Sequence, residues 1–152
     1  MDNLTIKGRV HFQIKGKNGV IKDEWDVINT VVTAGKAQIA LLAGDASATP
    51  FTFLAVGTSS TAVSVGQTAL VAEITTLGLA RASATVSRVT TTVTNDTLQL
   101  VYTWTASGSV TVEEIGILNA SSAGTMLARA LTGTKTLVNN DQLVATYKVA
   151  FA

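Results

Sequence analysis

The feature that most constrains the fold is a strict alternation of apolar and polar side chains over residues 4–15. The apolar row consists of Leu4, Ile6, Val10, Phe12 and Ile14. A period of two is typical of a β-strand with one buried face. Asn18-Gly19 separates this run from a second alternating run, and Asn-Gly is the strongest short signal for a β-hairpin. The chain is therefore predicted to open with a hairpin whose return strand spans residues 20–32.

Further alternating runs, separated by turn residues, predict strands along the rest of the chain. They span residues 51–56, 79–93, 98–105, 110–118, 126–131 and 143–151. One short helix is expected at residues 34–43, with Thr33 as its N-cap and Gly44 as a left-handed C-cap. Eight or nine strands with one helix favour an all-β, jelly-roll-like sandwich or barrel of antiparallel strands. A length of 152 residues suits a single β domain over 1–152.

The polar positions offer few groups for catalysis. Charged residues make up only 14% of the chain, His11 is the sole histidine, and there is no cysteine. His11 falls on the polar row of the first strand, where solvation is the simplest role. No Gly-x-Ser-x-Gly elbow supplies a nucleophile, and no alternating Asp/Asn run followed by Glu suggests a calcium loop. We expect a structural or binding protein with no enzymatic activity, no cofactor and no metal site.

Charge and hydropathy argue against two classes of partner. The net charge is +1, and the Lys and Arg residues are spread along the chain instead of clustering with aromatic residues. Nucleic acid is therefore not an expected partner. No apolar run approaches the roughly 18 residues of a membrane span, and the N-terminal residues do not resemble a signal peptide. We expect no membrane partner and synthesis in the cytoplasm of the producing cell.

Three arginines sit inside otherwise apolar or Thr-rich strand segments, at Arg81, Arg88 and Arg129. Adjacent strand residues point to opposite faces, so only one of Glu113 and Glu114 is expected to point inward. That carboxylate is expected to pair with one of the arginines inside the domain. Contacts between subunits are the alternative role for these arginines, because arginine is enriched at interfaces.

The aromatic residues alternate in register with other apolar residues, which predicts that they belong to the core. They are Phe12, Trp25, Tyr102 and Trp104. The alternative is a carbohydrate-binding platform, which would expose several of them on one flat face.

Three stretches together resemble a widespread group of small structural proteins of tailed bacteriophages. The first is Ile6-Lys-Gly-Arg-Val, a hairpin, and then Asn29-Thr-Val-Val-Thr-Ala-Gly-Lys before a helix. The second is Phe53-Leu-Ala-Val-Gly-Thr-Ser-Ser-Thr-Ala followed by Gln67-Thr-Ala-Leu-Val-Ala-Glu-Ile. The third is Glu114-Ile-Gly-Ile-Leu-Asn-Ala-Ser-Ser-Ala-Gly-Thr-Met-Leu-Ala-Arg. The resemblance covers most of the chain and implies an all-β virion protein without catalytic residues.

The resemblance further implies a capsid cement or decoration protein. Such a protein sits on the outside of the head as a homo-oligomer, a dimer or trimer, and bridges subunits of the major capsid protein. A tail, baseplate or fibre component, with a host-receptor or glycan-binding role, is the alternative. The helix and the loop at residues 58–68 are the expected contact segments, although the helix could instead only plug one end of the barrel. The candidate contact residues are Ile39, Leu42, Thr58, Ser59, Ser60, Val63, Arg81 and Arg129.

Overall fold

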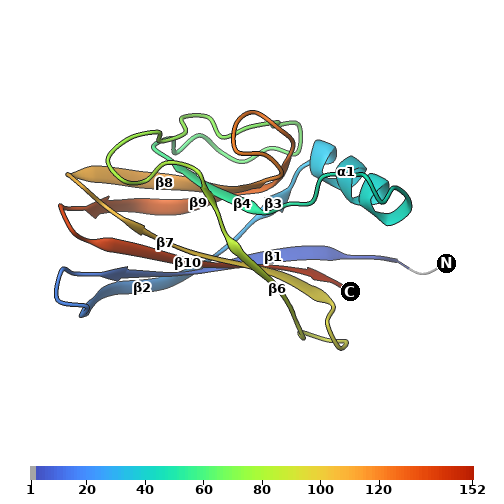
Figure 1. The fold of residues 1–152 in the computed structure, drawn as a ribbon, viewed down its shortest axis with the longest axis horizontal. Helices are drawn as coiled ribbons and strands as arrows, with labels where there is room; N and C mark the ends of the chain where they lie inside the picture. The colour runs from blue at the N-terminus through green and yellow to red at the C-terminus, as the bar shows by residue number, and fades with distance from the viewer. Residues whose placement is uncertain (1–2) are drawn as a thin grey trace.

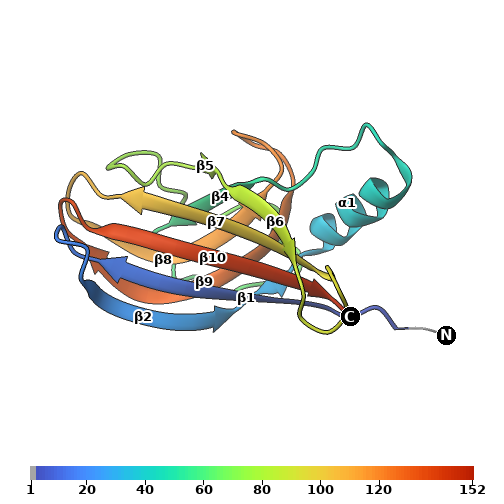
Figure 2. The ribbon, with the colours of Figure 1, turned by 60° about the horizontal axis from the view of Figure 1, so that its bottom comes forward.

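The computed structural model describes residues 3–152 and has the expected all-β sandwich architecture, built from two five-stranded antiparallel sheets (Figures 1 and 2). Sheet A has the order β2-β1-β10-β7-β6, and sheet B has the order β3-β9-β8-β4-β5. The strands of sheet A are β1 (Ile6–Lys15), β2 (Ile21–Ile28), β10 (Gln142–Phe151), β7 (Thr97–Thr105) and β6 (Thr85–Val89). Those of sheet B are β3 (Thr30–Val31), β9 (Met126–Leu137), β8 (Val110–Leu118), β4 (Phe53–Gly57) and β5 (Ala82–Ser83).

The predicted β1–β2 hairpin is confirmed. The Gly19 N–H donates to the Gly16 carbonyl (2.8 Å), and the Gly16 N–H donates to the Val20 carbonyl (2.8 Å). Gly19 has a φ of 80°, a conformation that costs a residue without a Cβ little. The Asn-Gly pair therefore forms the predicted turn, and the positive φ is at Gly19.

The prediction that the return strand continues to residue 32 is wrong. β2 ends at Ile28, and the chain then crosses to sheet B, where β3 pairs with β9. Asn29 makes the crossing: its N–H donates to the Gly8 carbonyl (3.2 Å), and its side chain fills the space that a Cβ on Gly8 would need. The glycine in the apolar row thus marks a close neighbour, as its position indicated.

The single long strand predicted at residues 79–93 is also wrong. This segment forms β5 in sheet B and β6 in sheet A, with Ala84 between them. The Ala84 N–H donates to the Thr52 carbonyl (2.8 Å), which anchors the point of crossing. Residues 85–88 are all exposed. Because alternation identifies a strand by its one buried face, it carries no information on a strand that is exposed on both faces.

The core lies between the two sheets and contains most of the aromatic side chains. Phe12, Trp104 and Tyr147 are buried, and the Trp104 Nε1–H donates to the Ala80 carbonyl (2.9 Å). Trp25 is half-buried and stacks on Phe12 with ring centroids 4.9 Å apart. The prediction of core aromatic residues is confirmed for Phe12 and Trp104, while Trp25 and Tyr102 are partly buried and pack against the core.

The single helix within residues 3–152, α1 (Thr33–Gly44), leaves the end of the sandwich next to the C-terminus and the start of β1 (Figure 1). Both predicted caps are wrong. Val32 is the N-cap residue and makes no side-chain cap hydrogen bond, while Thr33 already lies in the helix. Gly44 is the last helical residue and has no positive φ; the helix ends at Asp45, whose N–H donates to the Leu41 carbonyl (2.8 Å). The Thr33 N–H donates instead to the Val65 carbonyl (2.8 Å), so a loop supplies the cap.

Candidate functional site

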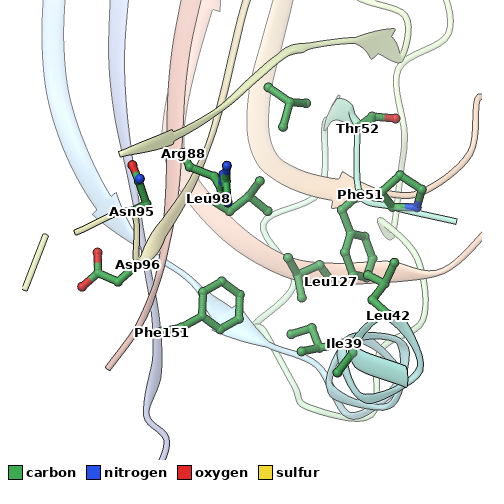
Figure 3. Close-up of a pocket in the computed structure, with 13 residues that line it drawn as sticks. Ile39, Leu42, Phe51, Thr52, Arg88, Asn95, Asp96, Leu98, Leu127 and Phe151 are labelled. Atoms are coloured by element: carbon green, nitrogen blue, oxygen red, sulfur yellow. The ribbon is translucent and has the colours of Figure 1, made fainter. Parts of the chain in front are cut away.

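An apolar groove of about 450 Å³ lies between α1 and the nearby end of sheet A (Figure 3). One wall comes from α1, residues 50–52 before β4, and Leu127 of β9. The other comes from β6, β7, the turn between them and the end of β10. In Figure 3 the side chains of the two walls face each other across the groove. The apolar lining consists of Ile39, Leu42, Ala43, Pro50, Phe51, Val86, Leu98, Leu127 and Phe151.

The groove lies beside a helix that packs on sheet B through β9. Gly35 is buried against the backbone of Leu127 in β9, where a Cβ would collide with the Leu127 carbonyl. This close approach fixes the start of the helix on sheet B. The predicted contact residues Ile39 and Leu42 are half-buried and form the helix side of the groove. Ile39 and Leu42 therefore pack against the core and also present an apolar wall to the groove.

Three polar residues, Arg88, Asn95 and Asp96, line the rim of the groove on the sheet A side. Arg88 is exposed and forms no ion pair within residues 3–152. Asp96 accepts hydrogen bonds from the N–H groups of Val93, Thr91 and Thr92, each at 2.8 Å. These bonds hold the pKa of Asp96 well below its usual range, so the carboxylate is negative at neutral pH.

The predicted contact loop at residues 58–68 runs across sheet B without helix or strand. Thr58 and Ser60 are exposed, while Ser59 and Val63 are half-buried. The loop ends in a segment whose Glu73 forms an isolated antiparallel bridge with Gly57. Its exposed hydroxyl groups give the sandwich a polar, uncharged surface over sheet B.

Arg129 fixes this loop from within and has no exposed surface. Its Nε donates to the Glu114 Oε2 at 2.6 Å, and both side chains are 0% exposed. Its other nitrogen atoms donate to the carbonyls of Thr61 (2.8 Å) and Ser59 (3.4 Å). Glu114 is thus the inward carboxylate, and its pairing with an arginine inside the domain is confirmed. Arg129 cannot itself contact a partner in this structure.

Arg81 has a similar internal role. It forms an ion pair with Glu73 through two hydrogen bonds, 2.8 Å from Nε and 2.6 Å from Nη2. Its Nη1 donates to the carbonyls of Ala120 (2.9 Å) and Ala123 (2.8 Å) in the β8–β9 turn. Because its side chain is only 8% exposed, Arg81 ties the turn to the loop and contributes little surface.

His11 lies in a charged network on the outer face of β1 and β2. Its Nδ1 is 2.6 Å from Asp26 Oδ1, and its Nε2 is 2.8 Å from Glu24 Oε1. The hydrogen bond to Asp26, supported by Glu24, raises the pKa of His11 above its ordinary value. With a carboxylate at each ring nitrogen, the imidazolium is favoured and neither nitrogen is free to take a proton from a nucleophile. The sequence predicted the exposure of His11 but not this pairing.

The described residues, 3–152, contain neither a metal-binding cluster nor a membrane-spanning helix. Within this range there is no group of three or more His, Asp or Glu residues placed to hold a metal ion. No helix in this range combines the length and the apolar character that a membrane span needs.

Comparisons with protein-family models, with curated proteins and with solved structures found no match to this chain.

Proposed function

We propose that the protein is a structural component of a bacteriophage virion, a capsid cement or decoration protein that binds the outside of the head and bridges major capsid protein subunits. Its partners are then the major capsid protein and further copies of itself, and its location is the capsid surface after assembly in the host cytoplasm. The three sequence stretches that resemble phage structural proteins support this role. The observation that carries it is the apolar end of the sandwich, where the groove and α1 lie uncovered.

Uncovered apolar surface of this kind marks a site of protein contact. A cement protein also needs surfaces that contact several neighbours at once. The loop at residues 58–68 lies over sheet B, whereas the groove lies at the end of the sandwich, so the two can meet different subunits. When one contact has formed, the second becomes intramolecular, and weak interfaces add up to stable attachment.

The internal ion pairs fit a protein that presents fixed loops to a shell. Glu114–Arg129 and Arg81–Glu73 both lie beneath surface loops and hold them in one conformation. A loop that is already ordered loses less conformational entropy when it binds. Catalysis finds no comparable support, because the single histidine is enclosed by two carboxylates.

The copy number per virion tests the proposal. Residues 23–36 form a tryptic peptide, because Lys22 precedes it and Lys36 ends it. An isotope-labelled standard of this peptide would be quantified in purified virions against a peptide of the major capsid protein. A ratio near a simple fraction of the capsid protein supports the cement role.

A few copies per particle would contradict the cement role and place the protein in the tail, baseplate or fibre. Receptor and glycan binding would then be tested next. Absence from purified virions would overturn both structural roles. A control sample of virions treated with protease before lysis separates surface proteins, which lose the peptide, from internal ones.

A further inference from the structure

Helix α1 has no polar face. Of its twelve residues, only Thr33, Lys36 and Gln38 are polar, and the rest are Ala, Gly, Ile or Leu. Its inner side packs on sheet B and lines the groove. A helix that is apolar all round is normally buried on every side. In the isolated chain, the opposite side of α1 is uncovered.

The uncovered side can be placed from helical geometry. Successive residues turn by about 100°, so residues 37, 40, 41 and 44 fall on the side opposite Ile39 and Leu42. Ala37, Ala40, Leu41 and Gly44 are all exposed, and Leu41 is 48% exposed. We call these four residues the α1 ridge. It is a narrow apolar surface with one large side chain.

The groove beside α1 offers the complementary shape. Its sheet A wall is apolar and open, with Val86 42% exposed and with Leu98 and Phe151 half-buried. The same chain therefore carries both a protruding apolar ridge and an apolar groove. Because these surfaces lie on opposite sides of α1, one copy cannot fill its own groove with its own ridge.

The groove and the helix each carry one basic and one acidic side chain. The groove rim carries Arg88 and the carboxylate of Asp96. The helix carries exposed Lys36 in its first half and exposed Asp45 at its C-terminal end. The C-terminal end of a helix also bears partial negative charge. A ridge seated in a groove can place its Asp45 end toward Arg88 and its Lys36 half toward Asp96.

We propose that the α1 ridge of one copy binds in the groove of a second copy, with Leu41 next to Val86. This proposal rests on the proposed function only in placing the association in a virion. The association itself is measured on the purified protein alone. The occupant is a second copy because this chain supplies both apolar surfaces and both pairs of opposite charges. Leu41 is the central apolar anchor of the contact, and the charged pairs set its direction.

The absence of cysteine makes a direct cross-linking test possible. Leu41→Cys and Val86→Cys would be made as separate proteins, one labelled with ¹⁵N, and mixed under mild oxidation. A disulfide-linked dimer with one labelled and one unlabelled chain is expected from the mixture and from neither protein alone. Val138→Cys is the matched control: Val138 is 50% exposed in the β9–β10 turn, at the opposite end of the sandwich (Figure 1).

The proposal would be overturned if Leu41→Cys gave the same yield of cross-linked dimer with Val138→Cys as with Val86→Cys. Dimers formed by Leu41→Cys alone, without dimers in the mixture, would also overturn it, because the helices would then pair with each other. If the groove instead binds a small ligand or an unrelated protein, no specific cross-link between copies will form.

Sedimentation velocity provides the independent measurement. The wild-type protein is expected to associate at a protein concentration of about 0.1 mM, and Leu41→Lys is expected to weaken the association by at least about tenfold. Val138→Lys should leave it unchanged. Circular dichroism would check that both variants keep the β-sandwich, which is expected since both side chains are exposed. A wild-type protein that stays monomeric at this concentration overturns the self-association. The copy number in virions tests the cement role independently of this result.

Discussion

Replacing Arg129 by methionine is the sharpest single test of how the surface loop is held. Methionine fills similar space without charge, so the change leaves the Glu114 carboxylate buried with no cation beside it. Glu114 would keep only the N–H donors of Ala72 (2.7 Å) and Val71 (3.1 Å). Breaking one partner of a fully buried ion pair costs about 3–5 kcal/mol. That is a large part of the roughly 5–15 kcal/mol that stabilises a typical domain.

Urea unfolding followed by tryptophan fluorescence would measure this loss, since Trp104 lies in the core. With a slope of about 2 kcal/mol per molar urea, the transition midpoint should fall by about 1.5–2.5 M. The double variant Glu114→Gln/Arg129→Met removes both charges together. It should be less destabilised than the sum of the two single variants, with a coupling of about 0.5–3 kcal/mol.

If Arg129→Met lowers the free energy of unfolding by less than about 1 kcal/mol, the reasoning is refuted, because an exposed ion pair contributes only that much. Thermolysin digestion separates global from local loss. Residues 58–68 lack Lys and Arg but contain Ala and Val, so a loosened loop becomes a new thermolysin site while trypsin leaves it intact. Strict additivity of the two single variants would equally contradict the pairing.

The sequence predicts strands well where one face of the sheet is exposed to solvent and the other is buried. The run at residues 4–15 is such a case, and β1 lies where the alternation places it. The run at residues 79–93 fails because β6 is exposed on both faces, and small polar residues on such a strand do not show which sheet it joins. The crossing at Asn29 is hidden for a related reason, since alternation continues through it while the partner strand changes from β1 to β9.

The candidate site was predictable only in its separate parts. Ile39 and Leu42 could be placed on an apolar helix face from their spacing. The groove itself could not be predicted, because its walls come from six segments between residues 39 and 151. Their proximity follows from the order of strands in the sheets. The Glu114–Arg129 pair shows the intermediate case: the sequence supplied an inward carboxylate and three candidate arginines, and the β8–β9 pairing then selected one.

Two further changes test the packing of α1 and the charge network on β1. Gly35→Ala should destabilise the protein by about 1–3 kcal/mol, because its Cβ collides with the Leu127 carbonyl, whereas Gly44→Ala, which meets no atom within 4 Å, should stabilise it by up to about 1 kcal/mol. Equal effects in thermal unfolding would contradict the close packing of α1 on β9. His11 should titrate by NMR above 6.5, since its carboxylate neighbours raise its pKa, Asp26 foremost. Its stabilising contribution is therefore complete below the unfolded-state pKa and is lost as the pH rises through the folded-state pKa. Asp26→Asn should bring the pKa of His11 back toward 6.5, and an unchanged titration would show that the contact with Asp26 does not hold the proton.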